Sequence, residues 1–84
     1  LAAAQGAAAG QFALGVSYER GEGVPQDYVQ AHMWFNLAAS QTTDEARDNT
    51  VRQRDRVAGQ MAPTQIAEAE RLAHEWGHAH PREP

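Results

Sequence analysis

The chain repeats a short alanine-rich motif at a fixed interval. Leu1-Ala2-Ala3-Ala4-Gln5 returns as Leu37-Ala38-Ala39-Ser40-Gln41, an offset of 36 residues. A fixed period between about 20 and 50 residues is typical of solenoids, in which each unit buries its apolar face only by stacking on a neighbour. The period therefore predicts stacked structural repeats, and such stacks present an extended surface to a binding partner.

Length and composition exclude several classes of function. The 84 residues allow one small domain. The net charge is −4, whereas a nucleic-acid-binding domain needs a basic face that neutralises phosphates, so nucleic acid is not an expected partner. The chain has no cysteine, which rules out disulfides and thiolate metal sites. It has no apolar run of about 18–20 residues, so we expect no membrane insertion.

The first expected boundary lies at Gly6. Residues 1–6 resemble the last turn of a helix, and a glycine is the residue that most often closes a helix C-terminus. We interpret them as the end of a preceding repeat. On this interpretation the chain is a fragment of a longer protein.

Residues 7–41 form one full repeat of two helices. The first helix is expected from about residue 7 to residue 20, and Gly21 and Gly23 end it because glycine accepts backbone angles closed to other residues. The second helix, about residues 28–40, follows Asp27, a good N-cap. His32 is expected on its surface. The apolar face of this helix contains Ala31, Trp34, Phe35, Ala38 and Ala39.

The sequence pattern of residues 42–80 predicts a second, divergent helix pair. Thr42 and Glu45 match a capping box, so the third helix is expected to begin at Thr42 or Thr43. The fourth helix is expected to begin at Pro63, because proline is favoured at the first helical position. Its inward-facing residues are predicted to be Ile66, Ala69, Leu72, Ala73 and Trp76.

One segment, residues 10–39, combines several specific motifs. In chain order they are Leu14-Gly15, Tyr18, Gly21, Gly23-Val24, Asp27, Ala31, Trp34 and Ala38-Ala39. This string resembles the Sel1-like repeat family, a relative of the tetratricopeptide repeats, whose units are helix–turn–helix pairs. One departure from the family pattern is Ala62, which stands at the cap of the fourth helix, and alanine is a poor capping residue.

The resemblance implies an all-α fold, an α/α solenoid of two antiparallel helix pairs. Residues 42–80 are similar to the helix pair that caps the array at the C-terminal end of many bacterial members, and residues 81–84 form a tail. The family implies a non-enzymatic scaffold or adaptor module of a larger bacterial protein, which binds a protein or peptide and uses no cofactor. We also expect self-association through the open N-terminal edge, residues 1–13.

The repeat period also predicts a binding surface. Helical spacing places Phe12, Val16 and Glu19 on the side of the first helix opposite Leu14 and Tyr18. Equivalent faces of the first helices line a continuous groove in helical repeats. Adding one period carries this face to the third helix, and the predicted binding residues are therefore Phe12, Val16, Glu19, Asp48, Arg52 and Asp55.

One string suggests a different chemistry. His74-Glu75-Trp76-Gly77-His78 fits the pattern H-E-x-x-H, in which two histidines on one helix face bind zinc and the glutamate acts as a base. The alternative function is therefore a zinc-binding or zinc hydrolase module using His74, Glu75 and His78. A catalytic zinc needs a third protein ligand, for which His80 is a candidate. The favoured interpretation assigns no metal, because histidines also suit the negative end of a helix.

Overall fold

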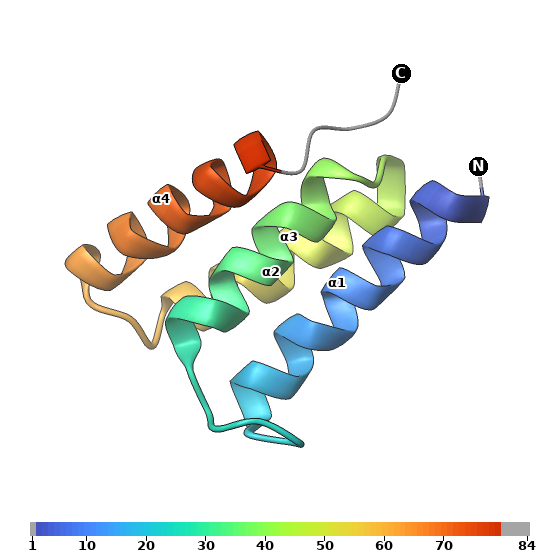
Figure 1. Ribbon diagram of the computed structural model, residues 1–84. Helices are drawn as coiled ribbons and strands as arrows, with labels where there is room; N and C mark the ends of the chain where they lie inside the picture. Colours follow the sequence, from blue (N-terminus) through green and yellow to red (C-terminus); the bar gives the residue numbers. More distant parts are fainter. Residues whose placement is uncertain (1, 80–84) are drawn as a thin grey trace.

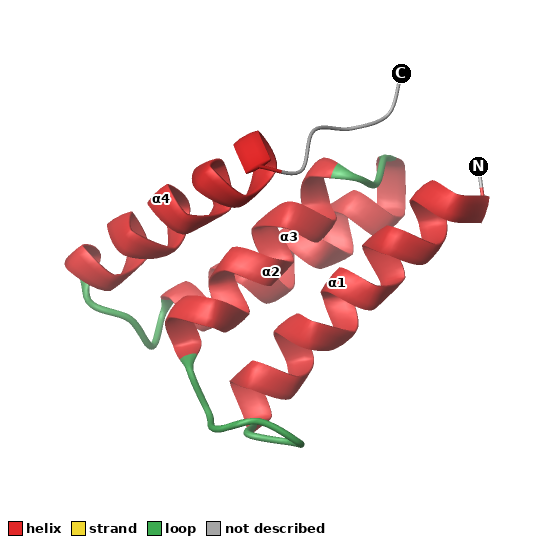
Figure 2. Cartoon of the chain, viewed as in Figure 1, coloured by secondary structure: helices red, strands yellow, loops and turns green. Residues whose placement is uncertain are grey.

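Four helices joined by short turns make up the described part of the chain, residues 2–79, in a computed structural model. They are α1 (Ala2–Arg20), α2 (Tyr28–Ser40), α3 (Asp44–Ala58) and α4 (Pro63–Ala79). Figures 1 and 2 show them running up and down in turn, with no strand among the described residues. The predicted all-α fold of two antiparallel helix pairs is confirmed.

Helix α2 is the centre of the molecule. It packs against α1, α3 and α4, which surround it in Figure 1. The two helices of the second pair, α3 and α4, make few direct contacts with each other. Each is held by α2 instead, so the second pair is more open than the first.

The turn between α1 and α2 follows the sequence prediction. Gly21 and Gly23 have φ angles of 70° and 79°, a region that residues with a side chain rarely adopt. Asp27 is the N-cap of α2, and its carboxylate accepts a hydrogen bond from the backbone N–H of Gln30 at 3.2 Å. These three residues fix where α1 ends and α2 begins.

The prediction that Gly6 closes a helix is wrong. Helix α1 runs without interruption from Ala2 to Arg20, through Gly6 and Gly10. Alanine has the highest helix propensity, so the alanine-rich segment extends α1.

The predicted capping box at Thr42 and Glu45 is also wrong. Helix α3 begins one residue after Thr43, its N-cap, which makes no side-chain capping bond. The Thr42 hydroxyl donates back to the carbonyl oxygen of Ala38 at 3.2 Å and thus closes α2. Asp44 then turns the chain with a φ of 56°, a conformation that aspartate tolerates better than most residues.

Helix α4 begins at Pro63, as predicted. The preceding residue, Ala62, has no side chain that can cap the helix. Gln65 compensates for this, because its Oε1 accepts a hydrogen bond from the Ala62 backbone N–H at 2.8 Å. A capping box has two hydrogen bonds, and this is the one in which the side chain of the third helical residue accepts from the N-cap backbone.

The first core cluster joins α1, α2 and α3. Phe35 is fully buried, and its ring lies edge-on to that of Phe12 with centroids 5.3 Å apart. A Cβ atom added to Gly15 would lie 2.7 Å from the Phe35 ring, so α1 approaches α2 closely at this glycine. The buried members are Ala31, Phe35 and Val57, surrounded by half-buried Phe12, Val16, Tyr18, Tyr28 and Met61.

The second core cluster joins α2 and α4. Its centre is an edge-to-face contact between Trp34 and Trp76, with ring centroids 5.6 Å apart. Trp34 thus packs against the second helix pair through α4. All five predicted inward residues of α4 are buried or half-buried. The buried members of the cluster are Met33, Leu37 and Ala73, with half-buried Trp34, Leu72 and Trp76.

Candidate functional site

A groove lies between the first halves of α1 and α3, and we call it the α1–α3 groove. Its volume is about 520 Å³. Alanines and Phe12 make its floor apolar, while side-chain amides and hydroxyls from the α2–α3 turn and α3 offer hydrogen bonds. The lining residues are Ala8, Ala9, Phe12, Gln41, Thr42, Thr43, Ala46, Asn49 and Thr50.

Three predicted binding residues of α1 face α3 rather than open solvent. Phe12 lines the α1–α3 groove and also packs on the first core cluster. Val16 is half-buried against that cluster. This predicted binding face of α1 is partly covered, because α3 packs beside α1 on this side. Leu14, expected to face inward, is instead 38% exposed.

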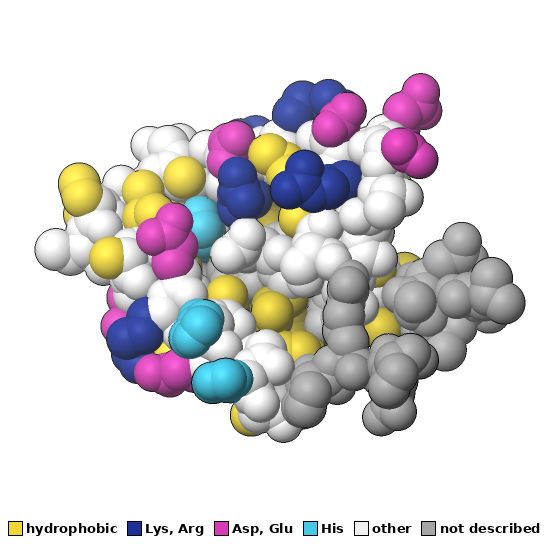
Figure 3. All heavy atoms as spheres, turned by 90° about the horizontal axis from the view of Figure 1, so that it is seen from above, with side chains coloured by type: hydrophobic (Ala, Val, Ile, Leu, Met, Phe, Trp, Pro, Cys, Tyr) yellow, Lys and Arg dark blue, Asp and Glu magenta, His cyan; other side chains and the backbone are white. Residues whose placement is uncertain are grey.

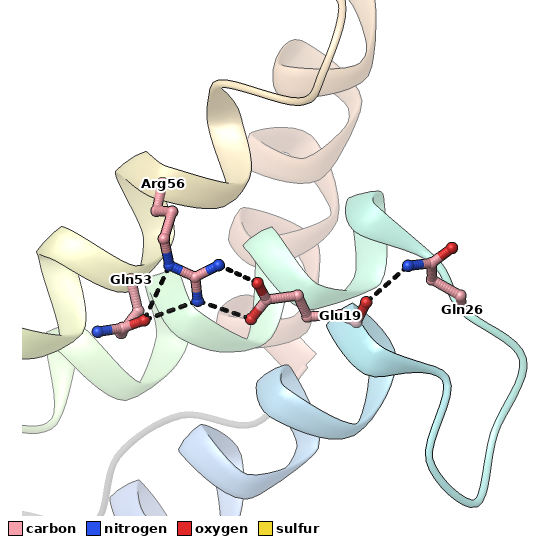
Figure 4. Close-up of polar contacts among 4 residues, drawn as sticks. All are labelled: Glu19, Gln26, Gln53 and Arg56. Carbon is pink, nitrogen blue, oxygen red and sulfur yellow. Dashed lines mark hydrogen bonds and ion pairs between the residues drawn. The ribbon is translucent and has the colours of Figure 1, made fainter.

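Glu19, the third of these residues, forms an ion pair across the α1–α3 contact. Figure 4 shows the Arg56 guanidinium donating to both carboxylate oxygens of Glu19 and to Gln53 Oε1. Gln26 Nε2 donates to the backbone carbonyl of Glu19 at 2.8 Å. Glu19 therefore fastens α3 and the α1–α2 turn to the end of α1.

The other three predicted binding residues lie on α3 and are exposed. Asp48 and Arg52 point to solvent, and Asp55 accepts hydrogen bonds from neighbouring Arg54. They occupy on α3 the positions that Phe12, Val16 and Glu19 occupy on α1. None of the three lines the α1–α3 groove, so the structure does not bring the two predicted triplets together. Whether these six residues bind a partner stays a prediction.

A second groove lies between the C-terminal halves of α2 and α4, and we call it the α2–α4 groove. Its volume is about 460 Å³. The residues that line it are Asn36, Leu37, Ser40, Glu70, Ala73, His74, Gly77 and His78. Asn36 is held from the α3 side, because its Oδ1 accepts a hydrogen bond from Arg54 Nη1 at 3.1 Å.

The H-E-x-x-H string lies at the end of α4, on the rim of this second groove. His74 and His78 are exposed, and their ring centroids are 5.4 Å apart. Glu75 pairs with Arg71, with 2.5 Å between Oε2 and Nη1. Within residues 2–79 no three histidine, aspartate or glutamate side chains are placed to hold one metal ion. His80, the predicted third ligand, lies outside the described residues.

His32, expected on the surface, is buried with 3% of its area exposed. Its Nδ1 is buried without a hydrogen-bond partner. Burial lowers the pKa of His32 below 6.5, and Arg54 lowers it further, while Glu70 and Asp55 act in the opposite direction. The sequence pattern missed this residue because α2 contacts three helices and is buried nearly all round.

Charged side chains gather in two places on the view from above in Figure 3. Arginine and acidic side chains lie intermixed along the upper edge, and histidines lie with further charges at the lower left. No extended basic face is visible from this side, in accord with a net charge of −4. None of the four described helices is long and apolar enough to cross a bilayer.

Comparison with known proteins bears directly on the first helix pair. Residues 8–42 match the family model of the Sel1 repeat, which covers most of α1, all of α2 and the turn that follows. No curated protein and no solved structure matches the chain. The matched residues form the helix–turn–helix pair that the family resemblance implied. Residues 8–42 therefore carry a Sel1 repeat, in agreement with the resemblance seen in the motif string.

Proposed function

We propose that the chain is a non-enzymatic module that binds a peptide segment of a partner protein in the α1–α3 groove. The observation that carries the proposal is the groove itself, which combines an apolar floor with polar side chains. Sel1 repeats mediate contacts between proteins, and the groove lies between the first helix of the repeat and the first helix of the following pair.

The lining indicates how a peptide is held. Phe12 and Ala46 offer apolar surface for one anchor side chain, and anchors in such pockets contribute most of the binding free energy. Asn49 and Gln41 carry amides that can both donate to and accept from a peptide backbone.

The charge beside the groove indicates the class of peptide. Asp44, Glu45 and Asp48 are exposed in the first turns of α3, next in sequence to the groove residues Thr43 and Asn49. Complementary charge steers association and suppresses wrong partners. The preferred peptide therefore carries one apolar anchor and at least one lysine or arginine.

The test selects binders from a random peptide library and measures their affinity for variants of the chain. Ala46→Phe fills the groove from an exposed position and should weaken binding by more than about ten-fold. Ala67→Phe is the matched control, because Ala67 is exposed on α4 outside the groove. Asp48→Lys should weaken binding of basic peptides, an effect that salt screens.

Two outcomes contradict the proposal. One is a library that yields no enriched peptide. The other is a set of peptides that bind the Ala46→Phe and Ala67→Phe variants equally well, which would place the binding surface elsewhere. Circular dichroism of each variant shows whether the fold is retained.

We further propose that the outer face of α1 associates with a second copy of the chain. Leu14 is the exposed large hydrophobic residue of the described part, and exposed Gly10 and Ala13 lie beside it. The position of Leu14 is occupied one period later, on α3, by Thr50, which is only 4% exposed. The same helix face is therefore covered in α3 but uncovered in α1.

Light scattering should show concentration-dependent association that Leu14→Glu removes. A strict monomer at high concentration would contradict it.

A further inference from the structure

His74 and His78 are a histidine pair that the peptide-binding function does not use. They lie one helical turn apart near the end of α4, and both imidazoles are exposed on the rim of the α2–α4 groove. Their ring centroids are 5.4 Å apart with 47° between the ring planes. The spacing and accessibility of the two rings are what a metal ion requires of a chelating pair.

The distance between the rings fits a single bound ion. Metal–nitrogen bonds of roughly 2.0–2.1 Å in tetrahedral geometry place the centroids of two imidazoles about 5 Å apart. The observed separation of 5.4 Å is close to this value. Two histidines at this helical spacing are also the ligand pair of the H-E-x-x-H motif.

The surroundings of the pair leave the other coordination positions open. Gly77, between the two histidines, has no atom within 4 Å of where a Cβ would lie. Glu70, one turn before His74, lines the same groove and offers a carboxylate that accepts hydrogen bonds from a metal-bound water. Within residues 2–79 no third histidine or carboxylate completes a set of protein ligands.

We infer that His74 and His78 form a two-histidine site for a divalent transition-metal ion, with water in its remaining positions. Imidazole nitrogens suit copper, nickel and zinc, and among divalent ions of this row Cu²⁺ binds most tightly. The order of affinity is therefore Cu²⁺ before Ni²⁺ and Zn²⁺. This inference is independent of the α1–α3 groove and of peptide binding.

The site differs from a zinc hydrolase centre. A catalytic zinc ion is held by three protein ligands, whereas this pair supplies two. Glu75, which the motif would use as a base, is paired with Arg71 on the exposed side of α4. The expected property is reversible metal binding rather than hydrolysis.

The experiment titrates the full chain with CuCl₂ in a non-coordinating buffer at pH 7.5. Calorimetry should show one binding site for Cu²⁺. Either His74→Gln or His78→Gln should weaken it by more than about ten-fold, because each removes one of two nitrogen ligands. Both residues are exposed, so unchanged helix content by circular dichroism is expected in each variant.

A matched variant separates geometry from the number of histidines. His78→Gln combined with Ala79→His keeps the histidine count but moves one ring off the face that His74 occupies. This variant should bind Cu²⁺ as weakly as His78→Gln alone. Paramagnetic broadening in NMR spectra should begin at residues 74–78.

Three results would overturn the inference. The first is that both single variants bind Cu²⁺ as tightly as the wild-type chain. The second is that the matched variant binds Cu²⁺ as tightly as the wild-type chain. The third is NMR broadening that begins away from the end of α4. His80→Gln extends the test, because a loss equal to that of His78→Gln would replace the two-ligand site by a three-ligand site.

Discussion

The two helix pairs of this chain have the same period but are held together differently. In the first pair, α2 places Phe35 against Gly15 of α1, and the ring is fully buried. One period later, Arg71 of α4 stands at the position of Phe35 and Val51 of α3 at the position of Gly15. Arg71 is exposed. Because α4 lacks the aromatic residue, α3 and α4 do not close on each other, and both depend on α2.

The same contrast holds for the outer face of each first helix. Phe12 and Val16 on α1 are half-buried against the core, whereas Asp48 and Arg52 at the same positions of α3 are exposed. Charged residues at these positions do not offer the apolar contact that α1 gives to α3. The second pair therefore repeats the order of helices but not the apolar positions that hold the first pair together.

The largest expected effect follows from the two equivalent positions Phe35 and Arg71. Phe35→Ala removes a fully buried ring from the first cluster and should cost about 3–5 kcal/mol of unfolding free energy. Arg71→Ala should change the urea midpoint little, because its ion pairs with Glu68 and Glu75 are exposed. Urea unfolding followed by circular dichroism measures both. Equal losses would show that the two pairs are held alike.

A smaller effect is expected at the close approach of α1 and α2. Gly15→Ala brings a methyl group against the Phe35 ring and should destabilise the chain by about 1–3 kcal/mol. Gly10→Ala is the control on the same helix, since no atom lies within 4 Å of its added Cβ. It should stabilise the chain by about 0.5–1 kcal/mol. Thermal melting of the two variants checks the opposite signs, and a stabilising Gly15→Ala would contradict the packing of the first pair.

The third prediction uses pH to probe how α2 holds the second pair. His32 is buried next to Arg54 and Asp55 of α3 and Glu70 of α4, and its pKa lies below 6.5 in the folded chain. The unfolded chain therefore binds more protons, so stability is complete above pH 6.5 and declines as pH falls toward the lowered pKa. In addition, the Nδ1–H of a protonated His32 would be buried without an acceptor, which is unfavourable.

Urea midpoints measured between pH 7.5 and pH 5 test this effect. His32→Gln should flatten the decline, whereas His74→Gln, an exposed change on α4, should leave it in place. A decline of the same size in both variants would assign the pH dependence to other groups.

The smallest effect is expected at the ion pair that joins α1 and α3. A double-mutant cycle of Glu19→Gln and Arg56→Gln should give a coupling of about 0–1 kcal/mol, because the arginine is largely exposed. High salt should reduce it further. A coupling well above this range would mean that charge, and not the packing of Phe12 and Val16 in the cluster with Val57, holds α1 to α3.

The sequence alone determined the elements that depend on local chemistry. Gly21, Gly23 and Asp27 fix the first turn, and Pro63 fixes the start of α4, because each acts through its own backbone or its nearest neighbours. The 36-residue period and the motif string also identified the repeat family. Apolar spacing on α4 correctly gave the residues that face inward, since that helix packs mainly on one helix, α2.

Only the tertiary structure decided which faces are covered. Leu14 and His32 were each placed on the wrong side of the boundary between core and solvent. Helical spacing tells which residues share a face, but the burial of a face depends on how many helices surround it. Helix α2 has three neighbours and α1 lacks a cover over Leu14, and both facts arise from contacts between distant segments that no local pattern records.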